Sequence, residues 1–164
     1  NYPNVRFDVA DHGVFPFPDA SVDAVVSLQV IEHLASPRDF VVECARVLRP
    51  GGTFVLSTPN RLTFSPRGIR NPFHTVEFAP DELRGVLESR FDVAMLGGTF
   101  HRNRLRFCEL FMRTGLPERL IAQPVPEWPA WLRRLVNRVT PKDFAISDRD
   151  VDRSLDLVAV ARRR

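Results

Sequence analysis

The chain has 164 residues, a formal net charge of +3 and a hydrophobic fraction of 44%, a composition typical of a globular protein. That length suffices for one compact domain with a core, so we predict a single domain over residues 1–164, and no apolar run is long enough to span a bilayer. The basic residues, nearly all arginine, are scattered and no base-stacking platform is evident, which argues against nucleic-acid binding.

Two segments in the first part of the chain have the pattern of strands. Residues 4–11 alternate in polarity and predict a strand that ends at Asp11. Residues 23–28 form a short apolar run, which is typical of a parallel strand buried on both faces. The segment 29–33 follows directly at the carboxyl end of this second strand.

A helix with clear start and stop signals comes next. Ser36 is the predicted N-cap, Pro37 takes the first helical position, and Asp39 is placed to reach back to the cap. Residues 50–52, Pro-Gly-Gly, end the helix and lead into a strand over residues 53–57. Strand, helix and strand predict a right-handed βαβ unit, and such sheets bind ligands beyond the carboxyl ends of their strands.

The second half of the chain contains one more helix and two more strands by the same criteria. A loop rich in Pro, Arg and Asn covers residues 63–72, and a helix begins at Pro80. A strand over residues 91–96 is predicted to end at the glycine pair 97–98. The apolar run at residues 155–161 predicts the last strand.

Residues 99–151 are predicted to form a helical insertion before the last strand, with two amphipathic patterns. The second pattern, residues 128–139, places Trp128 and Trp131 on its apolar side and three arginines opposite. A basic amphipathic helix with tryptophans is typical of a helix that lies at a membrane surface. The alternative is a helix packed on the domain with its arginines in water.

Four short motifs together resemble one family: PFPD at 16–19, IEH at 31–33, LRPGG at 48–52 and TPNR at 58–61. From about Val5 to Arg61 the chain resembles the central segment of class I S-adenosylmethionine-dependent methyltransferases, above all the small-molecule group that includes ubiquinone-biosynthesis O-methyltransferases. The resemblance implies a Rossmann-like three-layer α/β sandwich, with a mostly parallel sheet whose last pair is antiparallel. It also implies S-adenosyl-L-methionine as the methyl donor.

The resemblance assigns contacts with this cofactor to four residues. Asp11 would accept a hydrogen bond from the adenine amino group, and the backbone amide of His12 would face the adenine ring. Leu28 and Gln29 would lie against the methionine part. From the residues alone, Asp11 is also consistent with an acid that caps a turn, and the His12 side chain is expected in solvent.

Three residues are expected at the reaction centre by the same resemblance. Glu32 and His33 would face it, and His74 would border the substrate pocket. Methyl transfer mainly requires positioning, but a hydroxyl acceptor must lose its proton, and histidine is the usual base near neutral pH, so His33 is the candidate general base. The alternatives are that Glu32 and His33 cap the next helix and that His74 is merely exposed.

No metal is expected in this site. Some related O-methyltransferases hold a divalent ion with a Glu-x-x-Glu-His motif. Gln29 stands at the first of these positions in this chain and removes one anionic oxygen ligand.

The glycine-rich cofactor loop and the ribose-binding acid of the family are not found, since they would follow two strands ahead of Asn1. We therefore expect the sequence to be part of a longer chain, and a non-catalytic methyltransferase-like scaffold is the alternative. A nicotinamide dehydrogenase shares the fold type but requires a glycine fingerprint. Without the two strands, residues 5–10 would have no neighbour, and the edge of the strand at 23–28 would be bare.

The expected partner is a small-molecule acceptor, with O-methylation favoured. Residues 128–139 are predicted to form a lid whose apolar face contacts a lipid-like or otherwise hydrophobic acceptor, with peripheral membrane contact or plain packing as alternatives. Cys44 and Cys108 have no disulfide or metal spacing, which fits a cytoplasmic protein, and no signal peptide is visible in a chain that begins with Asn1.

Overall fold

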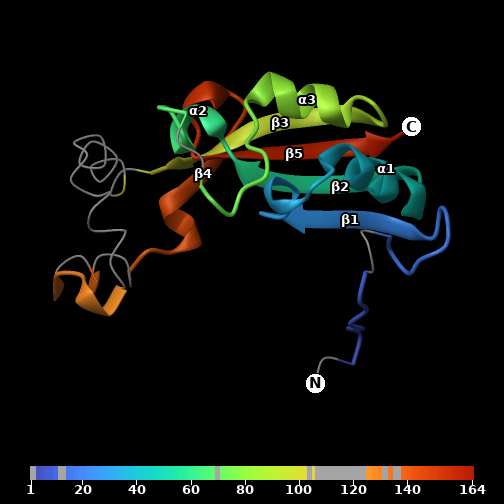
Figure 1. Ribbon diagram of the computed structural model, residues 1–164, viewed down its shortest axis with the longest axis horizontal. Coiled ribbons are helices and arrows are strands. Elements are labelled where there is room, and N and C mark those ends of the chain that lie inside the picture. Colours follow the sequence, from blue (N-terminus) through green and yellow to red (C-terminus); the bar gives the residue numbers. More distant parts are fainter. Residues whose placement is uncertain are drawn as a thin grey trace. The chain divides into compact units, whose positions relative to one another are not determined.

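A mixed sheet is the centre of the fold, and among the described residues it has five strands in the order β1-β2-β5-β3-β4 (Figure 1). The strands are β1 (Val22–Leu28), β2 (Leu48–Pro59), β3 (Phe91–His101), β4 (Phe144–Ser147) and β5 (Asp156–Arg163). The helices are α1 (Pro37–Val47), α2 (Arg61–Phe64) and α3 (Pro80–Leu87), with short 3-10 turns η1 (Ile31–His33), η2 (Val125–Glu127), η3 (Pro141–Asp143) and η4 (Val151–Arg153).

This computed structural model describes residues 3–10, 14–68, 71–102, 105, 125–130, 133–134 and 138–164. The chain divides into two compact units, the first made of Asn1–Gly98 with Ser147–Arg164 and the second of Thr99–Ile146. The predicted cofactor residues Asp11 and His12 lie outside the described residues.

The predicted α/β fold is confirmed, but the expectation of a mostly parallel sheet was imprecise. β1 pairs with β2 in parallel, whereas β5 is antiparallel both to β2 and to β3. The last strand of the chain enters between β2 and β3 in the opposite direction, so a single reversed strand creates two antiparallel pairs. The predicted antiparallel pairing of the last two strands is present as β3 and β5.

The βαβ unit forms where the sequence predicts it. Helix α1 has Ser36 as N-cap and Pro37 in its first turn, but the Ser36 side chain makes no capping hydrogen bond, so the predicted capping box is wrong. After the helix, Gly51 has a φ of +74°, which side chains rarely adopt. A Cβ at Gly52 would lie 2.8 Å from the Arg49 carbonyl oxygen. Both glycines lie inside β2, which begins directly after α1, at the point where its register with β1 shifts, so the predicted strand start at residue 53 was too late.

Helices α1 and α3 contact each other and pack on one face of the sheet. Alternate residues of β2 and β5 are buried against this layer, as a strand's period of two requires. The core is made of buried apolar side chains from both helices and three strands, among them Val41, Cys44, Phe54, Leu56, Leu83, Leu87, Phe91, Leu157 and Ala159. This layer fixes the positions of the strand ends.

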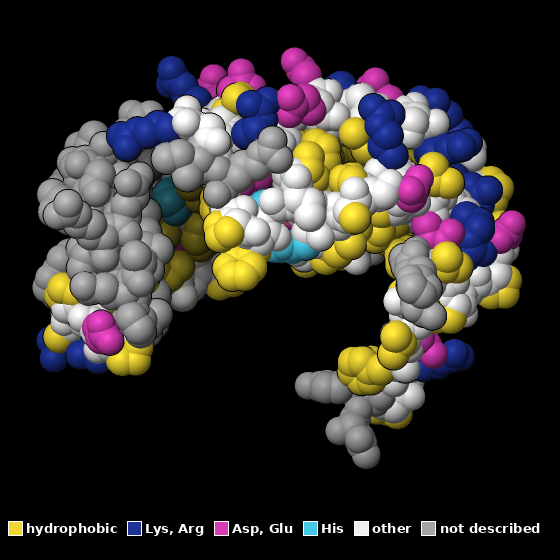
Figure 2. All heavy atoms as spheres, in the orientation of Figure 1, with side chains coloured by type: hydrophobic (Ala, Val, Ile, Leu, Met, Phe, Trp, Pro, Cys, Tyr) yellow, Lys and Arg dark blue, Asp and Glu magenta, His cyan; other side chains and the backbone are white. Residues whose placement is uncertain are grey.

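Among the described residues, β1 is the last strand on its side of the sheet. Val26 and Leu28 point to the face opposite α1 and α3 and are 63% and 58% exposed, so the expectation of a strand buried on both faces was wrong. Figure 2 shows hydrophobic side chains at the surface where β1 lies in Figure 1.

Residues 5–10 do not form the predicted strand. They have no ladder partner, and Phe7 and Val9 are almost fully exposed. The described part of the sheet has no strand beside the free edge of β1, so an alternating pattern has nothing to pair with. The segment's side chains instead pair locally, with the Arg6 guanidinium 2.7 Å from Asp8 Oδ1.

The glycine pair at 97–98 does not end β3, which continues to His101. A Cβ at Gly97 would lie 2.7 Å from the Ser147 carbonyl oxygen, and a Cβ at Gly98 only 2.1 Å from Ser154 Cβ. The two glycines therefore allow close approach to the strand, by the Ser147 backbone at Gly97 and by the Ser154 side chain at Gly98.

The second compact unit falls within the predicted insertion. Its two predicted amphipathic helices lie mostly outside the described residues, including Trp131, so the lid over 128–139 stays a prediction. In the parts that are described, Trp128 is half-buried, and Arg133, Arg134 and Arg138 are exposed. None of the described helices has the length and apolar character needed to cross a membrane.

Candidate active site

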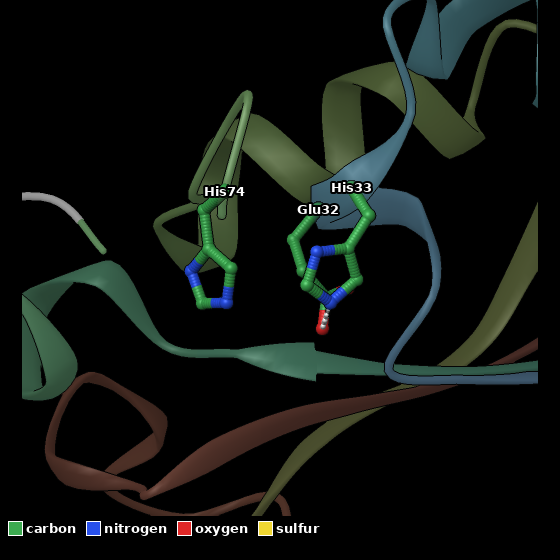
Figure 3. A group of neighbouring side chains, drawn as sticks. All are labelled: Glu32, His33 and His74. Carbon is green, nitrogen blue, oxygen red and sulfur yellow. Dashed lines mark ion pairs between the residues drawn. The ribbon is translucent and has the colours of Figure 1, made fainter. Parts of the chain in front are cut away.

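Three predicted residues come together just beyond the carboxyl end of β1 (Figure 3). Glu32 and His33 lie in η1, whereas His74 belongs to the loop that leads to α3. Thr75 attaches this loop to η1, because its backbone N–H and its hydroxyl donate to the Glu32 carbonyl oxygen at 2.8 and 3.0 Å. The rings of His33 and His74 are therefore adjacent, with their centroids 5.0 Å apart.

Glu32 has a buried carboxyl group, and one of its two oxygens accepts a hydrogen bond. Its side chain is 1% exposed, and the Thr58 hydroxyl from the end of β2 donates to Oε2 at 3.0 Å. The other oxygen, Oε1, lies 3.9 Å from Nε2 of His33. A buried carboxylate needs such partners, because removing it from water without them is costly.

One ring nitrogen of His33 is fixed by the backbone. Its Nδ1 lies 2.9 Å from the carbonyl oxygen of Phe73. A carbonyl oxygen only accepts, so Nδ1 carries the proton, and in the neutral ring Nε2 is then an acceptor. The side chain is 46% exposed, so a ligand can reach it from solvent.

His74 is held in the same way by a carboxylate. Its Nδ1 is 2.9 Å from Glu77 Oε1, and the two side chains are 6% and 0% exposed. Burial raises the pKa of Glu77, but the Ser65 hydroxyl, the His74 ring and the Asn71 N–H together lower it below its ordinary value. Glu77 therefore stays ionised at neutral pH and orients His74, whose Nε2 is left as the free ring atom.

Gln29 occupies a strained position at the end of β1. Its φ is +55°, in the left-handed region that favours glycine. The side-chain amide lies within 3.3 Å of Ser57 Oγ and 3.4 Å of Asp156 Oδ1, which links β1 to β2 and β5. Such strain is most often found at functional sites.

The structure thus brings together Glu32, His33 and His74, and it places Leu28 and Gln29 at the adjoining strand end. Their functional roles stay predictions. Sequence reasoning missed the residues that hold this group in place, which are Ser57, Thr58, Thr75, Glu77 and Asp156. Only the position of Ser57 and Thr58 at a predicted strand end offered a signal.

Known proteins share sequence with this chain. Residues 1–56 match the model of a methyltransferase domain. A probable S-adenosylmethionine-dependent methyltransferase of Mycobacterium tuberculosis is 46% identical over 172 residues, which are 99% of this chain and 62% of the relative. A ubiquinone biosynthesis O-methyltransferase of Maricaulis maris is 46% identical over 43 residues, 26% of this chain and 17% of that relative.

A solved structure shows the same fold. It is an S-adenosylmethionine-dependent methyltransferase from Thermotoga maritima, described as a possible histamine N-methyltransferase, with a TM-score of 0.61 and 13% identity. The match covers 93% of this chain and 61% of that one. The chain spans about 62% of the length of the Mycobacterium tuberculosis relative. By sequence, the chain is similar to S-adenosylmethionine-dependent methyltransferases, and its fold is the fold of a solved methyltransferase of this kind.

Proposed function

We propose that the protein transfers a methyl group from S-adenosylmethionine to the oxygen of a small-molecule acceptor. The observation that carries this proposal is the cluster of Glu32, His33 and His74 at the carboxyl ends of β1 and β2. Ligands of α/β sheets bind at this end, so the cluster lies where an acceptor would meet the methyl donor.

The end of β1 fits the methionine part of the donor. Leu28 is 58% exposed there and offers apolar surface, while Gln29 adds a polar side chain held in place by Ser57 and Asp156. S-adenosylmethionine supplies a methyl group on a positively charged sulfur, which needs a positioned nucleophile more than an acid. Asp11 and His12 are the residues that we propose for adenine.

The surroundings of the cluster favour an acceptor with apolar surface. Phe64 stacks against His74 with the ring centroids 5.3 Å apart and is 49% exposed, and Phe73 and Val30 are 78% and 39% exposed. Figure 2 shows hydrophobic side chains next to the histidine atoms at the surface. A hydroxyl group placed among them would lie near Nε2 of His33, which in the neutral ring can accept its proton.

The experiment uses the full-length protein, isotopically labelled S-adenosylmethionine and an extract of small apolar molecules, and the methylated product is identified by mass spectrometry. We expect an O-methyl product. His33→Ala should lower the rate by roughly 10²–10⁴-fold, the usual contribution of a base, while donor affinity measured by calorimetry is unchanged. His101→Ala, outside the cluster, serves as the matched control.

Two results would contradict the proposal. A product methylated at nitrogen or carbon would show that the acceptor atom is not oxygen. Donor binding without transfer to any compound would favour the non-catalytic methyltransferase-like scaffold instead.

A further inference from the structure

We propose that Glu32, His33 and His74 bind a divalent transition-metal ion through two imidazole nitrogens and one carboxylate oxygen. One ligand atom from each residue lies within 4.8 Å of the other two. Figure 3 shows the three side chains side by side, although they come from two separate segments of the chain. The ion's role in catalysis rests on the proposed function, whereas its binding does not.

In each of the three side chains, one polar atom is hydrogen-bonded within the protein and the other can serve as a ligand. Nδ1 of His33 faces the Phe73 carbonyl oxygen, and Nδ1 of His74 faces the Glu77 carboxylate. The Thr58 hydroxyl occupies Oε2 of Glu32. The free atoms are therefore two Nε2 nitrogens and Oε1. Ligands of metal ions are usually oriented in this way by a second set of hydrogen bonds.

The donor set indicates which ions fit. Two imidazoles and one carboxylate suit Zn²⁺, Fe²⁺, Co²⁺ or Ni²⁺, whereas Mg²⁺ and Ca²⁺ prefer oxygen ligands. Bonds of about 2.1 Å would place the ligand atoms roughly 3 Å apart, so the cluster must contract on binding. His33 has room for this movement, because its side chain is 46% exposed. Three protein ligands also leave positions open for an acceptor.

This proposal differs from the expectation of a metal-free centre. That expectation depended on Gln29, which has no anionic oxygen and instead contacts Ser57 and Asp156. The local spacing did not reveal His74, which reaches η1 only because Thr75 attaches its loop there.

An ion in this position would activate the acceptor. With the ion bound, Nε2 of His33 is a ligand and cannot also be the base, so the ion takes over that role. A hydroxyl group bound at its open side would lose its proton to water, because the ion would lower the pKa of the hydroxyl group. The freed oxygen lone pair forms the bond to the methyl carbon. The carbon–sulfur bond breaks as its electron pair returns to the sulfur, which becomes a neutral thioether.

The test measures binding of the metal alone, without a methylation assay. Untagged full-length protein is treated with a chelator, desalted and titrated with Co²⁺ while the visible absorption of the ion is recorded. We expect one Co²⁺ per chain and its displacement by Zn²⁺. Glu77→Gln, which keeps the shape but loses the charge beside His74, should weaken binding by roughly 10–100-fold.

Removal of a ligand in His33→Ala or His74→Ala should weaken binding further, while His101→Ala leaves it unchanged. His33→Ala disturbs the fold less, because its side chain is half-exposed, and a melting curve verifies the fold. Equal Co²⁺ affinity in the wild type and in His33→Ala would overturn the metal site. If methyl transfer then persists in protein treated with the chelator, the proposed function still holds without the metal. If the metal binds but no methyl transfer is found, the metal site holds and the proposed function fails.

Discussion

Asn60 joins the end of β2 to the segment before β5. It is fully buried, and its side-chain N–H groups lie 3.0 Å from the Val151 carbonyl oxygen and 3.1 Å from that of Ser154. Its Oδ1 accepts a hydrogen bond from the Leu62 N–H at 3.1 Å. One side chain therefore satisfies buried backbone groups on two segments, which places the strand end that carries Thr58.

Asn60→Ala should lower the free energy of unfolding by about 1–3 kcal/mol, because it leaves buried carbonyl groups without donors. Asn60→Asp should also destabilise the protein, since a carboxylate has no N–H to give. Denaturant unfolding measures both. Asn4→Ala, at an exposed position, is the control. If all variants are equally stable, the hydrogen bonds of the Asn60 side chain do not contribute to stability.

The residues of the cluster differ in how far sequence predicts them. Glu32 and His33 are neighbours in one motif, so their joint position could be predicted. Their contacts with Thr58 and His74 depend on the pairing of β1 with β2 and on a loop that folds back to η1. A local sequence pattern cannot predict contacts between residues that are far apart in the chain. Glu77 was missed for the same reason, although it lies only three residues after His74.

At the level of helices and strands, sequence signals were reliable for features that depend only on neighbouring residues in the chain. Pro37 and Pro80 mark the helix starts that the structure shows, whereas the glycines expected to form a turn after α1 lie inside β2. Residues 5–10 had a good strand pattern and no partner. The glycines at 97–98 look like a stop signal but serve close packing, a distinction that depends on the neighbouring segments.

Two glycines offer a paired test of this distinction. Gly98→Ala should destabilise the protein by about 1–3 kcal/mol, because the added carbon would overlap with Ser154 and the strand must shift. Gly85→Ala should instead stabilise it by about 0.5–1 kcal/mol, because α3 has open space there and alanine favours the helix. Thermal melting separates the two outcomes, and a shift in the same direction for both variants would refute the packing role of Gly98.

Glu43 holds the segment before β1 against α1. The hydrogen bond from Arg46 lowers the pKa of Glu43, burial opposes this effect, and the N–H of Phe15 adds to it. The folded state therefore has the lower pKa. The resulting stability is present at pH values above the ordinary value of 4.5 and is lost as the pH falls through the lowered value.

Glu43→Gln should consequently cost about 1–2 kcal/mol at pH 7, the scale of a hydrogen bond to a charged group. The difference from the wild type should shrink as the pH falls below 4.5. Urea unfolding at several pH values measures it, with Glu88→Gln at a half-exposed ion pair as the control. A difference that is constant with pH would show that charge is not its cause.

At the scale of the whole molecule, the free edge of β1 is the dominant feature. An edge strand with exposed hydrophobic side chains is a template for pairing with another chain. None of the described strands pairs with the outer edge of β1, and Val26 and Leu28 are exposed on the sheet face away from α1 and α3. We therefore expect the 164-residue chain to self-associate.

Val26→Lys should weaken this association by about tenfold or more, because a charge on an edge strand discourages pairing. Analytical ultracentrifugation over a range of concentrations measures the effect. Val42→Lys on the exposed side of α1 is the matched control. If both variants behave alike, the contact lies elsewhere than β1.

The left-handed backbone of Gln29 has a consequence for evolution and for protein engineering. Glycine at this position would relieve the unfavourable φ, so a screen for heat resistance should select Gln29→Gly. The same change deletes the side chain that links Ser57 to Asp156 at the proposed donor site. Selection for heat stability would therefore favour glycine at position 29, whereas selection for the proposed methyl transfer would favour glutamine. Variants selected only for stability should lose methyl transfer while they keep their fold.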